Sequence, residues 1–571
     1  MRLLPAMAFL TISAMTILSA QLPGDRPAGN PRGTRSPVFA RNGVIATSQP
    51  LASAAGLQVM QEGGNAIDAA VTAAAVLAVV EPTMTGIGGD VFAIVYDPKT
   101  KQLRGLNSSG RAGAKADADR LVSTGHKTMP GAGAYTITVP GALAGWAELL
   151  EKQGTITLAR ALEPAIRYAR DGYPVAEIVA DQWEGGVKKL SQDPATAAVF
   201  LPNGRAPNPG EVFRNPDLAR TLEQVATGGR DVFYKGAIAK TIAADIERRG
   251  GFITAADLAA HKADWVEPIG TNYRGYDVYE IPPNTQGFVA LQMLNILEGY
   301  DIEALGHNSA EYLHLLVEAK RIGFADRSAY LADFDHVPPH VLKALVSKEY
   351  AATRRKEIDQ ARAASDYKPG TFAGTSTSPD PGAYFDDRDR GDTVYLAAAD
   401  GKGNAISFIN SLFGTFGSGV VVPGTGVVLH NRGSGFTLQQ GHPNRLAPGK
   451  RPFHTLVPAF IMKDGKPLMP FGVMGGDNQA QAHVQVVVNL VDFGMNVQDA
   501  GDAARVRHGG DGLAAESAIG EAIRAALSRR GHEVRDGRGA MGGYQAVFID
   551  PKTGVLMGGS DPRKDGLAVG W

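Results

Sequence analysis

The sequence contains no cysteine in its 571 residues, which excludes disulfide bonds, thiolate metal sites, a cysteine nucleophile and a lipid-modified N-terminal cysteine. Charge of one sign is also lacking: the formal net charge is −1, which gives no electrostatic case for nucleic acid or an anionic membrane surface as partner. Beyond the N-terminus, no apolar run is long enough to span a bilayer. The remaining composition, 44% hydrophobic and 20% charged, is that of a globular protein of two to four domains by length.

The N-terminus is typical of an export signal. Arg2 provides a short positive start, residues 3–18 carry no charge, and Ser19-Ala20 offers small residues for cleavage. An uncleaved membrane anchor is the alternative, because the apolar run is near the lower limit for crossing a bilayer. We expect residues 1–20 to be a cleaved signal peptide and the mature protein to be periplasmic or secreted.

Composition divides the rest of the chain into stretches of different character. Residues 21–37 are rich in Pro, Gly and Arg, which predicts a disordered lead-in. Helical and strand patterns alternate over residues 38–367, whereas residues 368–392 combine Gly, Pro and charge as a flexible linker does. Strands and helices on both sides of this linker predict an α/β fold, a layered sandwich with a break at the linker.

Periodicity and turn signals place individual elements within this outline. The run over residues 66–78 is small and apolar nearly all round, which predicts a buried helix. Residues 400–403 (DGKG) are a hairpin signal between two strands. We expect helices over residues 66–78, 158–171, 310–331, 480–490 and 515–530, and strands over residues 91–96, 393–399, 404–412, 544–550 and 555–558.

The candidate nucleophile lies where the linker meets a strand. Cutting the Asp392–Thr393 bond would give Thr393 a free α-amine beside its hydroxyl, which is a nucleophile and its general base in one residue. Ser411 lies on the return strand of the hairpin, and the N–H groups of Gly475 and Gly476 could form an oxyanion hole. Each feature has an ordinary alternative, a linker running into a strand or a tight glycine turn, but together they are what an N-terminal nucleophile hydrolase requires.

Other patterns carry weaker signals. Residues 86–90 (GIGGD) superficially match a phosphate loop but follow a helix and precede a strand, so we expect a turn. His314 and Glu318 share a helix face, yet no histidine nearby in sequence completes a metal site, so we expect a surface pair. Arg111, among small residues, is either a surface arginine or a bidentate receiver of a carboxylate. A serine nucleophile elbow with a convincing context is absent.

With these residues in view, the chain resembles the gamma-glutamyltransferase (glutathione hydrolase) family from about residue 40 to residue 571. The resemblance implies a proenzyme that cuts itself into a large subunit (38–392) and a small subunit (393–571), which stay together as an αββα sandwich. It also implies transfer of a γ-glutamyl group from a small-molecule amide such as glutathione to water or an amine, without metal or cofactor. The blocks that carry it are residues 62–70 (EGGNAIDAA), 139–142 (VPGA), 169–173 (ARDGY), 293–298 (MLNILE), 449–452 (GKRP) and 560–563 (SDPR).

The resemblance also assigns roles to single positions. Thr393 is similar to the family's nucleophile and new N-terminus, and Ser411 stands where the family has a neighbouring threonine hydroxyl. By position, Gly475 and Gly476 are the expected oxyanion donors, Arg111 the clamp for the donor's α-carboxylate, and Asn431 a residue lining the same pocket.

Several pocket positions depart from the family pattern. An acid that holds the donor's α-ammonium is replaced by Gly435, and a nearby glutamine by Arg432. The pocket loses an anion and gains a cation, which suits an acyl group with a carboxylate but no ammonium. The segment between Phe436 and Pro448 is short, so we expect the lid of some members to be missing. The other departures are Val394-Tyr395 in place of Thr-His, Phe413 in place of Asn, and the substrate-binding candidates His454 and Thr455 in place of Ser-Ser.

Three functions therefore remain open from the sequence. The first is cleavage or transfer of a γ-glutamyl group through a threonine acyl-enzyme. The second is hydrolysis of glutaryl amides, including glutaryl-cephalosporins, or of other small amides on the same scaffold. The third, of another class, is an exported binding protein without activity, which would have no need to retain self-cleavage.

Overall fold

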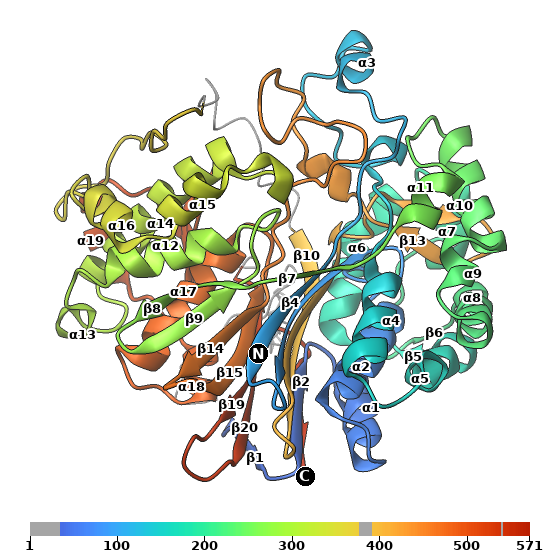
Figure 1. Cartoon of the computed structure of the whole chain (residues 1–571), viewed down its shortest axis with the longest axis horizontal. Helices are drawn as coiled ribbons and strands as arrows, with labels where there is room; N and C mark the ends of the chain where they lie inside the picture. The colour runs from blue at the N-terminus through green and yellow to red at the C-terminus, as the bar shows by residue number, and fades with distance from the viewer. Residues whose placement is uncertain (1–34, 376–390, 538–540) are drawn as a thin grey trace, which may run out of the picture.

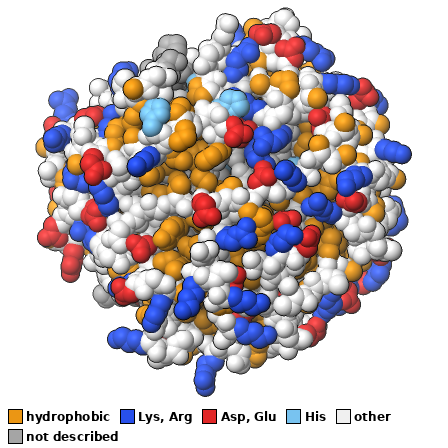
Figure 2. Space-filling view, viewed as in Figure 1, with side chains coloured by type: hydrophobic (Ala, Val, Ile, Leu, Met, Phe, Trp, Pro, Cys, Tyr) orange, Lys and Arg blue, Asp and Glu red, His pale blue; other side chains and the backbone are white. Residues whose placement is uncertain are grey.

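The computed structural model describes residues 35–375, 391–537 and 541–571. The predicted signal peptide, most of the lead-in and the middle of the predicted linker lie outside these ranges. Within them, no helix has both the length and the apolar character that crossing a membrane requires. Lys and Arg side chains are interspersed with Asp and Glu over the face in Figure 2, in keeping with the balanced net charge.

Two seven-stranded antiparallel sheets form the centre of the molecule and pack face to face. The contact is close enough that a Cβ added to Gly472 would lie 2.5 Å from the ring of Tyr395 in the facing sheet. The first sheet has the order β1 (Val38–Ala40), β20 (Leu556–Ser560), β19 (Gly543–Ile549), β15 (Lys466–Met474), β14 (Ala459–Lys463), β9 (Tyr276–Glu280), β8 (Ile269–Tyr273). The second has the order β21 (Leu567–Gly570), β2 (Gly43–Thr47), β10 (Gly391–Asp400), β11 (Ala405–Gly414), β3 (Asp90–Asp97), β4 (Gln102–Ser108), β7 (Asp264–Val266).

Helices cover the outer face of each sheet (Figure 1). The first sheet is covered by α12 (Gly287–Leu297), α14 (Ala310–Tyr330), α16 (Lys348–Arg355) and α17 (Asn478–Val491), at the left of the view. The second is covered by α1 (Pro50–Gln61), α2 (Ala66–Val80), α4 (Ala142–Gln153) and α5 (Leu158–Asp171), at the right. The predicted αββα sandwich is therefore confirmed.

The remaining elements surround these layers. Three small sheets consist of β5 (Tyr173–Pro174) with β6 (Val212–Phe213), β12 (Val420–Val422) with β13 (Val427–Leu429), and β16 (Val506–Gly509) with β17 (Gly512–Ala515) and β18 (Val534–Asp536). The other helices are α3 (Ala118–Ser123), α6 (Glu177–Leu190), α7 (Pro194–Phe200), α8 (Pro216–Gly228), α9 (Asp231–Tyr234), α10 (Ala237–Arg248), α11 (Ala255–Ala260), α13 (Ile302–Leu305), α15 (Pro339–Leu345), α18 (Val497–Asp502) and α19 (Glu521–Arg529).

Strands from before and after residue 393 are mixed within both sheets. In the second sheet β2, which precedes the predicted cleavage site, lies between β21 and β10 and pairs with residues 396–400 of β10, which follow that site. In the first sheet β1 pairs with β20, and β9 pairs with β14. The predicted large and small subunits therefore share continuous backbone ladders.

Helix α2 shows how the sequence builds these layers. Asn65 accepts the N–H groups of Ile67 and Asp68, while Asp68 accepts the N–H of Asn65, so both ends of the first turn are satisfied. Every residue of α2 is buried, because the helix lies between the second sheet and the helices outside it. Alanine at seven of the 15 positions keeps the helix thin enough for that place, and the predicted buried helix is confirmed.

Most predicted elements are confirmed, with two differences. The helix expected over residues 515–530 begins only at Glu521, because Ala515 ends strand β17, which is paired on both sides. The linker expected over residues 368–392 is held in the fold at both of its described ends, while its middle lies outside the described residues. The N–H of Gly370 donates to Asp326 on α14 at 2.7 Å, and β10 already begins at Gly391.

Candidate active site around Thr393

Thr393 lies at a β-bulge in the ladder between β10 and β11. The register slips between Asp392 and Val394, so that Ser411 and Leu412 together stand opposite Thr393. A bulge re-aims the side chains beside it, which is why such distortions gather near active sites. The backbone continues through the Asp392–Thr393 bond within β10, so the structure is that of the uncut chain.

The hydroxyl groups of Thr393 and Ser411 are in direct contact. Thr393 Oγ1 donates to Ser411 Oγ at 3.1 Å, and Thr393 is 1% exposed. Ser411 Oγ also accepts the backbone N–H of Phe413 at 2.8 Å and the Nη2–H of Arg432 at 3.2 Å. Ser411 therefore connects the candidate nucleophile to the Arg432 cation, a contact that could not be predicted from the sequence.

Arg432 is a fully buried guanidinium beside this pair. Its Nη1 donates to Thr455 Oγ1 at 3.3 Å, and its Cζ lies 4.1 Å from the ring centroid of Phe413. Its Nε has no hydrogen-bond partner within the described ranges. Burial lowers the pKa of Arg432 to about 9, although the carboxylate of Asp90 acts in the opposite direction. Phe413 has a φ of 80°, a left-handed conformation that bulky residues rarely adopt and that often marks a functional site.

Asp90, the first residue of β3, lies directly behind Ser411, with which it pairs across the sheet. Its Oδ1 accepts the backbone N–H of Gly110 at 2.9 Å. Its Oδ2 lies 3.3 Å from both His430 Nδ1 and His454 Nε2, and all three side chains are completely buried. The site thus contains a carboxylate held between two imidazoles.

The charges in this cluster follow from burial and mutual contact. Burial raises the pKa of Asp90, but the two imidazoles, which are protonated at the acid pH where Asp90 titrates, and the Arg432 cation outweigh burial and hold that pKa well below its usual range. Burial and the Arg432 cation lower the pKa of His454 to about 3, and burial also lowers the pKa of His430. The cluster therefore contains one anion, Asp90, one cation, Arg432, and two neutral imidazoles.

Arg111, the predicted carboxylate clamp, has partners within the protein. Its Nη1 donates to Asp333 Oδ2 and to the carbonyl of Gly449, both at 3.1 Å. Its side chain is 39% exposed, whereas that of Asp333 is 3% exposed. No contact between Arg111 and the Thr393–Ser411–Arg432 cluster occurs among the described residues, and its clamping role stays a prediction.

The other predicted site residues make hydrogen bonds with backbone groups around the cluster. Asn431 donates from Nδ2 to the carbonyl of Gly131 at 2.7 Å and accepts the N–H of Gly414 at 2.9 Å, so its amide is engaged with backbone groups. The carbonyl of Thr455 accepts Gln286 Nε2 at 2.9 Å, which fixes the segment that carries His454 and Thr455.

Gly475 and Gly476 lie between the end of β15 and the start of α17. Their φ values are 136° and 58°, conformations that favour glycine. The carbonyl of Gly476 accepts Gln286 Nε2 at 3.2 Å, so one glutamine holds both this turn and the Thr455 segment. The oxyanion role of the two glycines stays a prediction.

Residues 86–90 pass beside Ser411 as the expected turn. A Cβ on Gly89 would lie 2.4 Å from the carbonyl oxygen of Ser411, and one on Gly88 only 1.9 Å from that of Val428. The glycines are therefore needed for close backbone packing.

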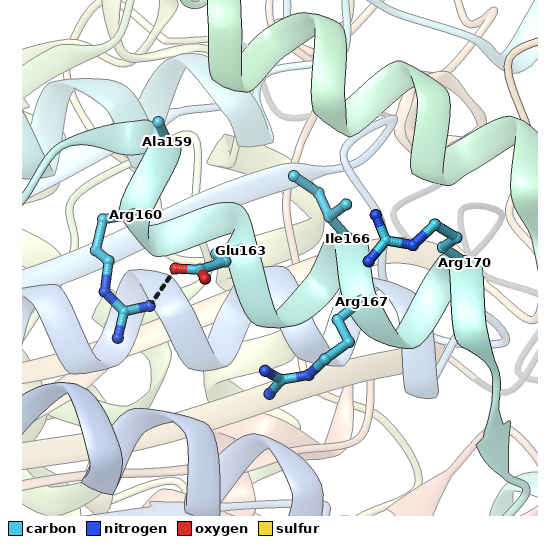
Figure 3. Close-up of a pocket in the computed structure, with 6 residues that line it drawn as sticks. All are labelled: Ala159, Arg160, Glu163, Ile166, Arg167 and Arg170. Atoms are coloured by element: carbon cyan, nitrogen blue, oxygen red, sulfur yellow. Dashed lines mark hydrogen bonds and ion pairs between the residues drawn. The ribbon is translucent and has the colours of Figure 1, made fainter.

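Two other clusters of charged side chains differ from this site. A surface hollow along α5 contains the arginines Arg160, Arg167 and Arg170 (Figure 3). Arg160 pairs with Glu163 at 2.8 Å and Arg170 with Asp171 at 3.1 Å, so these are solvated surface ion pairs. The hollow offers no nucleophile.

The prediction that His314 and Glu318 form a surface pair is wrong, because both are fully buried. His314 Nδ1 lies 2.8 Å from Nε2 of His532, a residue distant in sequence, and the three side chains converge. Glu318 already accepts from Arg321, from the N–H of Ala364 and from the hydroxyl of Tyr367. This network anchors the chain around residue 364 to α14.

Sequence reasoning missed Asp90 and His430. The signal for Asp90 was an acid at the start of an otherwise apolar strand, where the fold buries it. His430 adjoins Asn431 but belongs to no recognisable sequence motif. Its partner Asp90 lies 340 residues earlier in the chain (430 − 90).

Comparison with known proteins agrees with this geometry. The family model for gamma-glutamyltranspeptidase matches residues 52–571. The glutathione hydrolase-like YwrD proenzyme of Bacillus subtilis is 40% identical over 92% of this chain and 98% of its own length. The acylase ACY 1 proenzyme of Pseudomonas sp. strain SE83 is 36% identical over 94% of each chain. The crystal structure of cephalosporin acylase from Bacillus halodurans superposes with a TM-score of 0.87 at 43% identity, covering 94% of this chain and 97% of that one.

A family match over most of the chain, close relatives of nearly equal length and a shared αββα fold lead to one conclusion. The chain belongs to the gamma-glutamyltranspeptidase family and is an N-terminal nucleophile amidohydrolase.

Proposed function

We propose that this enzyme hydrolyses amides whose acyl group carries a distal carboxylate and no α-ammonium, as a glutaryl group does. The observation that carries the proposal is Arg432, a fully buried guanidinium in contact with Ser411, which itself contacts Thr393. A planar guanidinium with an unpartnered Nε suits a carboxylate, which it can bind through two parallel hydrogen bonds.

Among the described residues, the same site offers no matched partner for an ammonium group. Gly435 stands where the resemblance places an acid, and a Cβ there would lie 2.8 Å from the carbonyl oxygen of Phe453. The anion that the structure places nearby, Asp90, is already balanced by Arg432 and enclosed by imidazoles. A γ-glutamyl donor would therefore have to bring its ammonium out of water beside a cation, which is costly.

Maturation is the first step that we propose. Cleavage at Asp392–Thr393 would release the α-amine of Thr393, whose pKa is roughly 7.7–8.0 when unperturbed, close to that of an ideal base at neutral pH. It would also detach Gly391 and Asp392, which pair in β10 with Gly414 and Phe413. Because the ring of Phe413 lies over Arg432, freeing that end of the ladder is a route by which substrate could reach the guanidinium.

The chemistry then follows from the positions of the reacting groups. The α-amine takes the hydroxyl proton of Thr393 as the oxygen attacks the amide carbonyl. The predicted donors for the resulting oxyanion are the N–H groups of Gly475 and Gly476. The α-ammonium returns the proton to the leaving amine, which leaves an ester on Thr393. Water attacks this ester by the same route in reverse and releases the carboxylic acid.

The name of one relative, a glutathione hydrolase-like proenzyme at 40% identity, supports γ-glutamyl amides as the second candidate. The name of the structural neighbour, a cephalosporin acylase, supports the first. Three anilides with the same leaving group separate them: glutaryl, γ-glutamyl and butyryl, the last without a distal carboxylate.

We expect kcat/KM to be highest for the glutaryl anilide. Arg432→Gln should bring the glutaryl value down toward that of butyryl, and Arg111→Gln is the matched control, since it removes a guanidinium that Asp333 already pairs. A wild-type preference for γ-glutamyl of about tenfold or more, roughly 1.4 kcal/mol, would contradict the proposal. Restoring an acid at position 435 is a poor test, because the backbone of Phe453 leaves no room for a Cβ.

A further inference from the structure

The carboxylate of Asp90 is buried behind the nucleophile and takes no part in the catalytic steps described above. It lies across the sheet from Ser411, between His430 and His454, and opposite in charge to Arg432. Several polar atoms here have no hydrogen-bond partner within the described ranges, namely Asp90 Oδ2, Arg432 Nε and both ring nitrogens of His454. Buried polar atoms without a partner are few in folded proteins, and each calls for a physical reason.

The need for a counter-charge is the first step of the argument. A lone guanidinium removed from water would be strongly destabilised unless an anion lies close to it. Among the groups that act on Arg432, burial opposes its charge and Asp90 favours it. Asp90 is thus the group that allows a cation to persist beneath Thr393.

The position of Asp90 is the second step. Its Oδ1 is fixed by the N–H of Gly110, and its backbone is fixed by the β3–β11 ladder that also carries Ser411. The imidazole of His430 is fixed in turn, since its Nδ1 accepts the backbone N–H of Arg432 at 3.3 Å and its Nε2 lies 3.0 Å from the carbonyl of Thr138. The carboxylate therefore has a defined place relative to both Ser411 and Arg432.

We infer that Asp90 is a positioning residue of the active site, which acts through His430 and His454 to hold Arg432 charged and directed at Ser411 and the acyl carboxylate. The inference deepens the proposed function, on which its selectivity readout rests. It assigns Asp90 no contact with substrate and no part in proton transfer.

The pH dependence of kcat/KM provides a readout that a merely structural role would not change. The acid limb should follow the α-amine of Thr393 in every variant. A basic limb of the pH profile should appear as Arg432 loses its proton, because burial lowers the pKa of Arg432 to about 9. The charge of Asp90 also acts on Tyr234 and His261. Burial raises the pKa of Tyr234 above the pH range of the basic limb and lowers that of His261 to about 4, so neither group titrates in that range. His430 and His454 are neutral throughout the same range.

The decisive variant is Asp90→Asn, which keeps an oxygen for the N–H of Gly110 and removes the charge. We expect its basic limb to move to lower pH by about one unit or more, because burial of Arg432 is then opposed by no anion. The glutaryl/butyryl ratio of kcat/KM should fall with it, and Asp90→Asn should add little to Arg432→Gln in a double-mutant cycle. The smaller neutral variant Asp90→Ser serves if the asparagine variant does not fold.

The matched control is Asp245→Asn, another buried carboxylate, paired on α10 with Arg248 and Arg249. It should lower the melting temperature and leave both limbs in place. Basic limbs at the same pH in wild type and in the neutral Asp90 variants, for either anilide, would overturn the inference. A wild type that does not favour glutaryl over butyryl would instead overturn the proposed function, and the butyryl limbs would still test Asp90 through the contact of Arg432 with Ser411.

Discussion

Two arginines were candidates for holding the acyl carboxylate, and the fold treats them in opposite ways. Arg111 is 39% exposed in its side chain and paired with the carboxylate of Asp333. Arg432 is completely buried, contacts two hydroxyl groups and a ring face, and keeps a donor without a partner in the described part of the chain. The exposed arginine already has a carboxylate partner, whereas no contact within the described ranges pairs the buried one directly with a carboxylate.

This difference teaches that sequence position and charge alone do not identify a binding arginine. A surface ion pair changes little in free energy when one member is exchanged, because water screens it. A buried cation that lacks its full set of partners gains much more from an incoming carboxylate. Four experiments would break or sharpen this comparison.

The largest effect tests whether the arginines surround a nucleophile at all. Thr393→Ala should remain one chain and lose at least about 10³-fold in amidase activity, because the hydroxyl and the α-amine base disappear together. Intact mass should show wild type as two chains, the smaller starting at Thr393. A wild type that stays full length and is strongly active would contradict the mechanism.

The second experiment exchanges the arginines one at a time. Arg432→Gln should lower kcat/KM for the glutaryl anilide by about 10²-fold, roughly 3 kcal/mol, because a desolvated charge pair is lost. Arg111→Gln should cost less than about threefold, because its charge is exposed and shared with Asp333. Steady-state kinetics on self-processed protein gives both numbers, and the reverse ranking would restore Arg111 as the clamp.

The third experiment separates carboxylate binding from oxyanion stabilisation. Gly475→Ala should lower kcat by about tenfold while leaving the glutaryl/butyryl ratio unchanged, since the displaced N–H serves the transition state of every donor. Gly465→Ala is the control, because Gly465 also has a positive φ (71°) but lies in a turn with open space around it. A changed ratio in Gly475→Ala, or an equal loss of kcat in the control, would contradict the oxyanion role.

The smallest effect concerns acid stability and compares histidines of lowered pKa inside and outside the site. Burial lowers the pKa of His454 to about 3 and that of His261 and of His532 to about 4. Below pH ~6.5 the unfolded chain therefore binds protons that the folded chain does not, so the free energy of unfolding falls as pH falls.

Melting temperatures between pH 7.5 and 4.5 should show this decline. His261→Gln should make the decline with pH less steep, by the equivalent of up to one bound proton in the difference between the unfolded and folded states. His340→Gln, at an exposed position, is the control. An unchanged slope in His261→Gln would show that His261 is protonated in the folded protein.

The fold was predictable where local signals and tertiary contacts agree. Residues 66–78 and the hairpin around residue 400 combine strong periodicity with a cap or a turn, and both are confirmed. Prediction failed at Ala515, where small residues favour a helix but pairing with strands on either side takes the chain into a sheet. The sequence also could not reveal the hydrogen bond from the N–H of Gly370 to Asp326, which joins two segments that only the fold brings together.

The candidate site divides in the same way. Thr393, Ser411, Arg432 and Thr455 were named from the sequence, and the structure joins them in one chain of contacts. Asp90 was read as part of a turn, because its meaning depends on imidazoles that approach from other strands and loops. The sequence cannot reveal the pairing of Arg111 with Asp333 for the same reason.

The mixing of strands from both predicted subunits has a consequence for how the mature enzyme loses activity. Before cleavage, unfolding and refolding involve one chain and do not depend on concentration. After the predicted cleavage at Thr393 the two products would still share their ladders, so neither could leave without breaking a sheet. Once heat separates them, recovery becomes a second-order encounter between two incomplete sheets whose open edges also favour aggregation. Self-cleavage would then make thermal unfolding irreversible. The precursor could refold after unfolding, whereas the mature enzyme would keep its activity only as long as it stays folded.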